Sequence, residues 1–179
     1  VMTHDTWKQQ RDKKAFLALE DGTVYRGFSA GAAKDCLGEV VFNTGMTGYQ
    51  EIVTDPSYHG QIVVMTYPEI GNYGINLQDM ESHRCWANGF VVHRINRPSN
   101  WRSEKALQDF LTESGVPCLA GIDTRALTVH LRDRGTLKGY LSVEGSVSEH
   151  EAIARAQAWE GLDGQDYAAR VTCREGFEF

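Results

Sequence analysis

The chain has 179 residues, of which 41% are hydrophobic and 23% charged, a composition that predicts one folded domain with terminal segments and argues against disorder. The formal net charge of −6 argues against nucleic acid as the main partner, because binding to phosphates requires a basic surface. No apolar run approaches the roughly 20 residues of a membrane helix, and the polar start lacks the apolar core of a secretory signal, so we expect a cytoplasmic protein with no membrane partner.

Short apolar runs indicate the first strands. Residues 1–14 carry no apolar periodicity and predict a flexible arm. The stretch 15–31 contains two apolar runs around an Asp-Gly pair at residues 21–22, which predicts a β-hairpin with a type I′ turn. Strands are also expected over residues 38–43 and, rich in Val and Ile, over residues 61–67.

A dense polar segment, residues 42–58 (FNTGMTGYQEIVTDPSY), joins the last two of these strands. It is longer than most connections between elements, which favours a functional loop. Thr47 and Gln50 have the spacing of a capping box and predict a short helix over about residues 48–54, which the following proline would end. Ser57 would then lie on a constrained turn, from which its hydroxyl can point into a cleft.

Two interpretations of this segment are open. In the first, Ser57 and the region around Thr47 and Gln50 contact a ligand or a partner. In the second, the Thr, Asn and Asp side chains only satisfy the hydrogen bonds of their own turns. The residue types alone support both interpretations equally.

The middle of the chain alternates turns with a strand and a helix. Residues 67–74 (YPEIGNYG) predict turns with positive φ rather than a helix or a strand. Residues 77–82 are ambiguous, and residues 87–95 predict a strand. A helix is expected over residues 104–114, with Ser103 as its cap.

A second helix is strongly indicated after a short strand near residues 118–120. Asp123 is expected to cap it, and it should run over residues 124–134. Arg125 within it suits binding of a carboxylate or a partner, but a capped helix with a solvated basic face is the favoured interpretation. A strand over residues 137–143 follows.

The last residues predict one more helix and then a tail. Ser148 and Glu151 form a capping box, which indicates a helix that runs to Trp159. From Gly161 onward the sequence loosens and is typical of a tail that leads elsewhere. Strands dominate the first half and helices alternate with strands in the second, so we predict a mixed α/β (α+β) fold with helices packed on a sheet.

Several catalytic and metal-binding motifs are absent. The sequence has no P-loop, no GxGxxG after a strand, no GxCxG elbow, and no HxxxH or HExxH pair. The cysteines Cys36, Cys85, Cys118 and Cys173 are isolated, so we predict no metal site and four free, partly buried thiols. Cys36, close to Gly38, is a weak candidate nucleophile, because such a cysteine needs a sharp turn and a nearby histidine.

Four longer motifs occur in order: residues 42–58, YPEIGNYGIN at 67–76, GIDTRALTVHLRDRG at 121–135 and GLDGQD at 161–166. Together with the hairpin LEDGTVYRG, they closely resemble the small, glutamine-hydrolysing subunit of carbamoyl-phosphate synthetase. The resemblance runs from about Ala15 to about Val171 and covers only the N-terminal domain of that family.

The resemblance implies a swivelling β/β/α domain over residues 15–160, with residues 161–179 as a tail or the start of a linker. In the family, a class I glutamine amidotransferase domain with a Cys nucleophile, a His and a Glu follows. None of the four cysteines lies in that nucleophile motif. We therefore expect this chain to be a piece of a longer protein, with no catalytic residue of its own.

The resemblance also implies a substrate and a partner. The complete enzyme makes carbamoyl phosphate from bicarbonate, glutamine and two ATP, for pyrimidine and arginine synthesis. The small subunit releases ammonia from glutamine, and the large subunit, which binds ATP and magnesium, uses it. The Asp-Pro-Ser-Tyr match places at Ser57 the serine that reaches the glutamine site. No cofactor is expected in this chain itself.

Further residues of the motifs are candidates for interface contacts or loop support. The family often has a basic residue where this chain has Val129, which argues against a basic contact there. Alternative functions are a free-standing, non-enzymatic binding module of the same fold and, on weaker grounds, a hydrolase that uses Ser57. The candidates for interface or support are Thr47, Gln50, Asp55, Tyr58, Asn72, Asp123 and Arg125.

Overall fold

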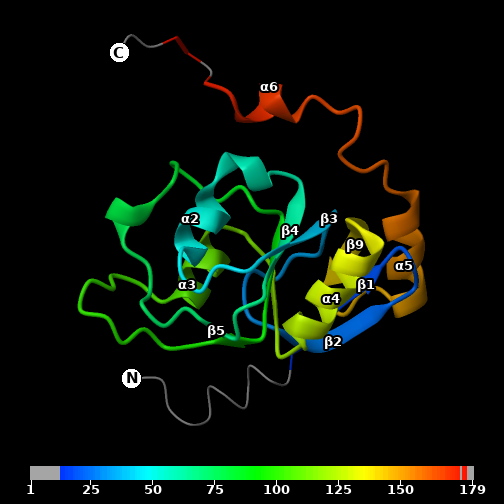
Figure 1. Cartoon of the computed structure of the whole chain (residues 1–179), viewed down its shortest axis with the longest axis horizontal. Helices are drawn as coiled ribbons and strands as arrows, with labels where there is room; N and C mark the ends of the chain where they lie inside the picture. Colours follow the sequence, from blue (N-terminus) through cyan, green and yellow to red (C-terminus); the bar gives the residue numbers. More distant parts are fainter. Residues whose placement is uncertain (1–12, 174, 177–179) are drawn as a thin grey trace.

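The computed structural model describes residues 13–173 and 175–176, and its centre is a closed barrel of seven strands (Figure 1). Around the barrel the strands follow the order β1, β2, β8, β6, β4, β3 and β9, and β9 pairs with β1 to close it. The predicted mixed fold is confirmed, whereas the sequence pattern does not predict the closure. The strands are Lys14–Leu19 (β1), Val24–Ser29 (β2), Cys36–Asn43 (β3), Gln61–Met65 (β4), Gly89–Val92 (β6), Cys118–Ala120 (β8) and Leu137–Ser142 (β9).

β1 and β2 form the predicted hairpin, but the turn is not of type I′. A type I′ turn needs a positive φ at both central residues. In this turn only Gly22 has one, of 92°. Gly22 N donates to Leu19 O at 3.0 Å and Leu19 N donates to Thr23 O at 2.9 Å, the pattern of a type I turn followed by a bulge. The Asp21 carboxylate accepts from Thr23 N at 3.0 Å, a local bond that favours this turn.

Strands β3, β4, β6 and β8 run parallel to one another, and β4, β6 and β8 are covered on both faces. In β4, Ile62 and Val64 belong to the interior cluster of the barrel, whereas Val63 and Met65 belong to the cluster outside it. All four side chains are fully buried. Side chains alternate along a strand, so burial on both faces explains the continuous apolar run that predicted this strand.

Helices cover two sides of the barrel and contribute to its interior cluster. α2 and α3 pack against the outer cluster of β4, β6 and β8, while α5 packs on β1 and β9. Leu127 and Leu131 of α4 pack with the interior residues. The helices are Tyr49–Thr54 (α2), Leu107–Glu113 (α3), Thr124–Arg134 (α4), Glu149–Ala158 (α5) and Tyr167–Val171 (α6), with short 3₁₀ turns at Pro56–Tyr58 (η1) and Leu77–Asp79 (η2).

Two of the predicted helix caps are confirmed. The Asp123 carboxylate accepts from Ala126 N at 2.9 Å, and the Ser148 hydroxyl oxygen accepts from Glu151 N at 3.2 Å. Both bonds join residues three apart in sequence, so the local pattern contained the information. The cap predicted at Ser103 is wrong, because its hydroxyl donates to Lys105 O and α3 starts later than expected.

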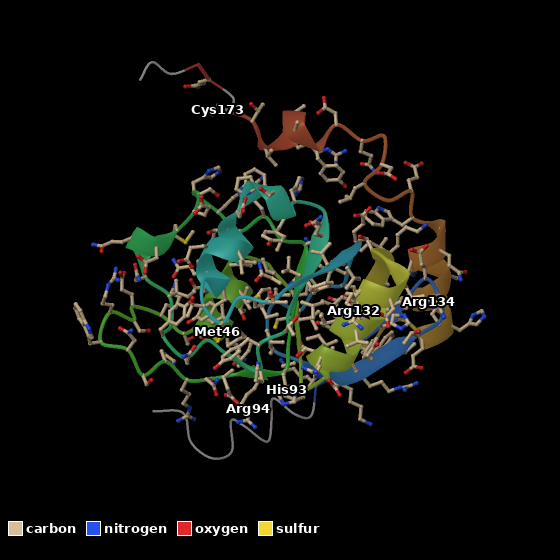
Figure 2. All side chains as sticks on the ribbon, viewed as in Figure 1. Met46, His93, Arg94, Arg132, Arg134 and Cys173 are labelled. Carbon is tan, nitrogen blue, oxygen red and sulfur yellow. The ribbon has the colours of Figure 1, made fainter. Side chains whose placement is uncertain are left out.

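The expected strand over residues 87–95 is split at His93, which is labelled with its neighbour Arg94 in Figure 2. The second part, β7 (Arg94–Ile95), leaves the barrel and pairs with β5 (Glu69–Ile70) in a separate two-stranded sheet. β5 lies in a stretch that predicted only turns. A strand this short gives no periodicity signal, which explains the error.

The ends of the domain differ from their predictions in detail. The arm predicted over residues 1–14 lies outside the described residues except for Lys13 and Lys14, and β1 already includes Lys14. Helix α6 forms where only a tail was expected. No helix in the described ranges is long and apolar enough to span a membrane.

Candidate functional site

The segment from Phe42 to Tyr58, hereafter the α2–η1 segment, connects β3 to β4 and carries the predicted site. Asn43 joins its two ends: its amide nitrogen donates to the Tyr58 hydroxyl at 3.1 Å, and its amide oxygen accepts from Gly45 N at 2.7 Å. β3 and β4 are parallel and Glu39 is the partner of Gln61, so the segment leaves the carboxyl end of β3 and returns to the amino end of β4. It is therefore a crossover connection between two neighbouring strands of the barrel.

Helix α2 starts without the predicted capping box. Gly48 precedes it with φ of 84°, a left-handed conformation that only glycine adopts readily, and no side chain of the segment caps the helix. The Tyr73 hydroxyl oxygen instead accepts from Gly48 N at 2.6 Å and from Tyr49 N at 3.2 Å. Thr47 makes no capping bond, because Gly48 occupies the cap position.

Tyr49 fixes the position of α2 on the GNYG turn. Its ring is fully buried and stacks on Tyr73, with ring centroids 4.1 Å apart and planes at 19°. Its hydroxyl donates to Gly74 O at 2.7 Å. Burial raises the pKa of both tyrosines, so both hydroxyls stay protonated at neutral pH.

Gln50 has a role that differs from the predicted cap. It is 1% exposed, its amide nitrogen donates to Asn76 O at 2.5 Å, and its amide oxygen accepts from Asn76 N at 3.0 Å. The Asn76 side chain in turn caps η2 by accepting from Gln78 N and Asp79 N. Gln50 is thus a buried support for the neighbouring loop, and it is not available to a ligand.

Ser57 lies where the sequence places it, on a turn just beyond α2. Asp55 is the cap of η1: its carboxylate accepts from Ser57 N at 2.8 Å, and Pro56 fixes the first position of the turn. Ser57 is exposed, and its hydroxyl makes no hydrogen bond to any described residue. The backbone of Ser57 is therefore held while its hydroxyl remains available.

The end of α2 is tied to the loop that follows η2. The Thr54 hydroxyl accepts from Glu81 N at 3.0 Å, and Thr54 O accepts from the Ser82 hydroxyl at 2.6 Å. Trp86 N donates to Val53 O at 3.0 Å. These bonds bring residues 81–86 alongside the turn that carries Ser57.

The end of the described chain returns to the same corner. Residues 160–173, hereafter the strap, follow α5 and include α6 (Figure 1). Leu162 and Tyr167 lie over Gly60, where a Cβ atom would come within 2.5 Å of Leu162 Cδ2 and 2.9 Å of Tyr167 Cε1. The Tyr167 ring also meets the His59 ring edge to face, with centroids 5.1 Å apart. Glycine at position 60 thus permits the strap to dock two residues from Tyr58.

The other predicted site residues lie apart from Ser57. Asn72 is exposed in the GNYG turn, and its carbonyl accepts from Ser99 N at 2.9 Å. Asp123 caps α4, and Arg125 is exposed on that helix. The structure therefore gathers the candidates around α2 and η1 into one group and leaves the α4 pair as a separate surface.

The thiols near the site are not activated as nucleophiles. Burial raises the pKa of Cys36 to about 12, and burial also raises the pKa of Cys85 and Cys118. A thiolate is the reactive form, so these three thiols are inert at neutral pH. No group of His, Cys, Asp or Glu side chains within the described ranges is arranged to hold a metal ion.

Sequence reasoning missed three residues that hold the site: Tyr73, Asn76 and Trp86. The first two meet their α2 partners across about 25 residues, a separation at which no helix or strand periodicity applies. Their place within the YPEIGNYGIN motif is the signal that could have found them. One oxygen of the Glu51 carboxylate, also missed, is buried without a hydrogen-bond partner in the described part of the chain.

Comparison with known proteins places this arrangement in a family. The model of the carbamoyl-phosphate synthase small chain, CPSase domain, matches residues 17–141. The carbamoyl phosphate synthase small chain of Thermus thermophilus is 50% identical over 171 residues, which cover 89% of this chain and 44% of that protein. Those of Pseudomonas aeruginosa and Rhodopirellula baltica are 48% and 52% identical, covering 93% and 89% of this chain but 44% and 41% of theirs.

This chain thus spans less than half the length of these relatives. Among solved structures, an aminopeptidase from Aneurinibacillus sp. strain AM-1 overlaps 73% of this chain and 30% of its own, at 14% identity and a TM-score of 0.38. A score this low is no evidence of a shared fold.

Proposed function

The chain belongs to the carbamoyl-phosphate synthase small-chain family, and on this premise we propose that it is the N-terminal domain of the small, glutamine-hydrolysing subunit. The alignment carries the proposal, because close to half of all positions are identical over 88–93% of this chain but over only 41–45% of the relatives. In this proposal the parent enzyme, a cytoplasmic ligase, makes carbamoyl phosphate from glutamine, bicarbonate and ATP. ATP and magnesium bind to the large subunit.

In the complete enzyme, Ser57 contributes one contact to glutamine. A hydroxyl donates to a carboxylate or accepts from an ammonium group, so it suits an amino acid. The observation that supports this role is the contrast between the backbone of Ser57, held by Asp55 at 2.8 Å, and its hydroxyl, which bonds to none of the residues that the structure describes. A turn fixed before the ligand arrives loses little entropy on binding.

The remaining candidates divide by exposure into two roles. Gln50 is buried and Asp55 and Tyr58 are half-buried, so they support the turn rather than contact a partner. Thr47, Asn72, Asp123 and Arg125 are exposed and are the candidates for contact with the large subunit. Ammonia must be kept from water and protonation on its way between subunits, so a tight junction is physically required.

Hydrolysis itself is assigned to residues outside this chain. The raised pKa values of Cys36, Cys85 and Cys118 leave these thiols protonated, and the sequence has no GxCxG elbow. His59 is the histidine nearest to Ser57 in sequence, but its ring meets Trp86 and Tyr167 edge to face. A hydrolase that uses Ser57 would need a base aimed at its hydroxyl, and no hydrogen bond of that kind occurs within the described residues.

The test is association with a purified carbamoyl-phosphate synthetase large subunit, measured by sedimentation and by calorimetry. We expect a defined complex and no release of ammonia from glutamine by this chain alone. Arg125→Glu should weaken the complex, whereas Glu144→Lys, an exposed substitution outside α4, should not. Failure of the folded chain to bind would overturn the proposal and leave the free-standing binding module. Cysteine-dependent ammonia release by this chain would overturn it as well.

A further inference from the structure

A cavity of about 560 Å³ separates the strap from the body of the domain, beside the turn that carries Ser57. One wall comes from η1 and the loop after η2, and the other comes from the end of α6. No carboxylate is among its described lining residues. They are Pro56, Ser82, His83, Arg84, Trp86 and the strap residues Arg170 to Cys173.

Trp86 holds a cation at the body wall of this cavity. Its indole is 6% exposed and donates from Nε1 to the Ser82 hydroxyl oxygen at 2.8 Å, which fixes the ring. The Arg84 guanidinium lies 3.7 Å from the ring centroid, and the His83 ring meets the indole edge to face. An aromatic face orients a guanidinium but supplies no negative charge, so Arg84 keeps its hydrogen-bond donors for another partner.

Arg170 holds a second cation at the strap wall. Its guanidinium lies 4.7 Å from the Tyr167 ring centroid and donates to the Gln165 amide oxygen at 3.4 Å. Neither Arg84 nor Arg170 forms an ion pair with a described residue. By contrast, other arginines of this chain pair with carboxylates: Arg26, Arg94, Arg102, Arg132 and Arg155.

The two arginines act on the same place. The pKa of His59 is lowered by burial and then by the positive charges of Arg84 and Arg170, so both guanidinium groups are close enough to affect one ring. Two positive charges thus lie close together without an ion pair among the described residues, in a chain with a net charge of −6. Like charges on two facing walls repel each other, whereas an anion between them would attract both walls.

We propose that this cavity binds a small oxyanion, a phosphate or a compact dicarboxylate, between Arg84 of the body and Arg170 of the strap. Arginine suits this ligand, because its planar fork of donors matches the oxygens of phosphate and carboxylate. The bound anion joins the two walls and so holds the strap on the domain. This site is separate from the glutamine contact at Ser57 and does not depend on it.

The test uses inorganic phosphate as the probe and hydrogen exchange of the α6 amides as the readout, with ionic strength held constant by sodium chloride. Phosphate should slow exchange in α6 in a saturable manner and leave α2 unchanged. Arg84→Gln and Arg170→Gln should each raise the half-saturating phosphate concentration about tenfold, since each removes charge-assisted hydrogen bonds. Arg134→Gln is the control: it removes the same charge from α4, away from Cys173 at the end of the strap (Figure 2).

A second arm replaces phosphate by succinate, and saturable protection by either anion that is lost in both site variants supports the proposal. Absence of protection by both anions would overturn it. Equal loss in Arg134→Gln would also overturn it, because the effect would then reflect total charge. Circular dichroism of each variant verifies the fold, and the exposed positions of all three arginines make misfolding an unsuitable explanation for a selective loss.

Discussion

The α2–η1 segment and the strap meet at the same corner of the domain, but they are held there in different ways. In the segment, Tyr49 and Gln50 are buried, and their polar atoms bond to the backbone of Gly74 and Asn76. The strap docks through half-buried side chains over Gly60, and its own hydrogen bonds are mostly local. One half of the corner is thus fixed by buried bonds, while the other half rests on surface contacts.

The difference assigns different tasks to the two regions. Native proteins open first where few apolar groups are buried and last where the core is dense. We therefore expect the strap to open at a lower free energy than α2. Ser57 lies on the α2–η1 segment, which is fixed, and close to the strap, which opens more easily. This position suits a preformed contact beside a segment that can move.

The largest expected effect comes from the buried side of the comparison. Tyr49→Ala removes a fully buried ring and its bond to Gly74 O, so the free energy of unfolding should fall by about 3–5 kcal/mol. Urea unfolding followed by fluorescence measures this change. Tyr49→Phe, which removes only the hydroxyl, should lower it by about 1 kcal/mol. Equal losses in the two variants would show that packing does not hold α2.

Gln50 tests the hydrogen bonds that replace the predicted cap. Gln50→Met keeps the shape of the side chain but leaves N and O of Asn76 without partners, so stability should fall by about 2 kcal/mol. Thr47→Ala is the matched control, and it should change stability by less than about 0.5 kcal/mol because Thr47 caps nothing. A larger loss of stability in Thr47→Ala than in Gln50→Met would mean that the capping box holds the helix after all.

On the strap side, Tyr167→Ala should separate docking from folding. It removes the contacts with Gly60 and His59, and since the ring is only half-buried, global stability should change by less than about 1 kcal/mol. Hydrogen exchange should become faster in α6 and stay unchanged in α2. Faster exchange across both helices would mean that the two regions open together.

The smallest expected effect is a pH dependence of strap docking. The docked state lowers the pKa of His59 below its ordinary value of 6.5, chiefly through burial. When the strap undocks, the pKa of His59 returns to its ordinary value, so below about pH 6.5 undocking is coupled to uptake of a proton. Docking therefore weakens as the pH falls below about 6.5 and is unaffected well above it. Exchange in α6, corrected for intrinsic rates, should accelerate on acidification, and His59→Gln should abolish this acceleration.

The sequence predicted those parts of the fold whose causes are local. The caps at Asp123 and Ser148 and the apolar run of β4 depend on residues within a few positions of each other, and all three are confirmed. The Ser57 turn was found in the same way, from the proline beside it. Its assignment to glutamine depends on the family resemblance, so that assignment stays a prediction.

The parts that the sequence did not predict depend on contacts between distant residues. Closure of the barrel requires β2 to pair with β8, and Phe28 and Ala120 carry no mark of this pairing. The Tyr73 hydroxyl caps α2 from another loop, so a local reading assigned the cap to Thr47. The strap docks through Leu162 and Tyr167 without periodicity. In each case, contacts between residues distant in sequence determine the structure, and the local sequence does not distinguish it from the alternatives.

The central claim is that the fixed turn of the α2–η1 segment presents Ser57 to glutamine. It is tested most directly by Ser57→Ala in the complete small subunit joined to the large subunit, with Ser146→Ala as an exposed control. Loss of one hydrogen bond corresponds to about 0.5–1.5 kcal/mol, so the glutamine KM should rise about 2- to 12-fold. Synthesis from ammonia should be unchanged. An unchanged glutamine KM, or an equal loss with glutamine and ammonia, would contradict the account.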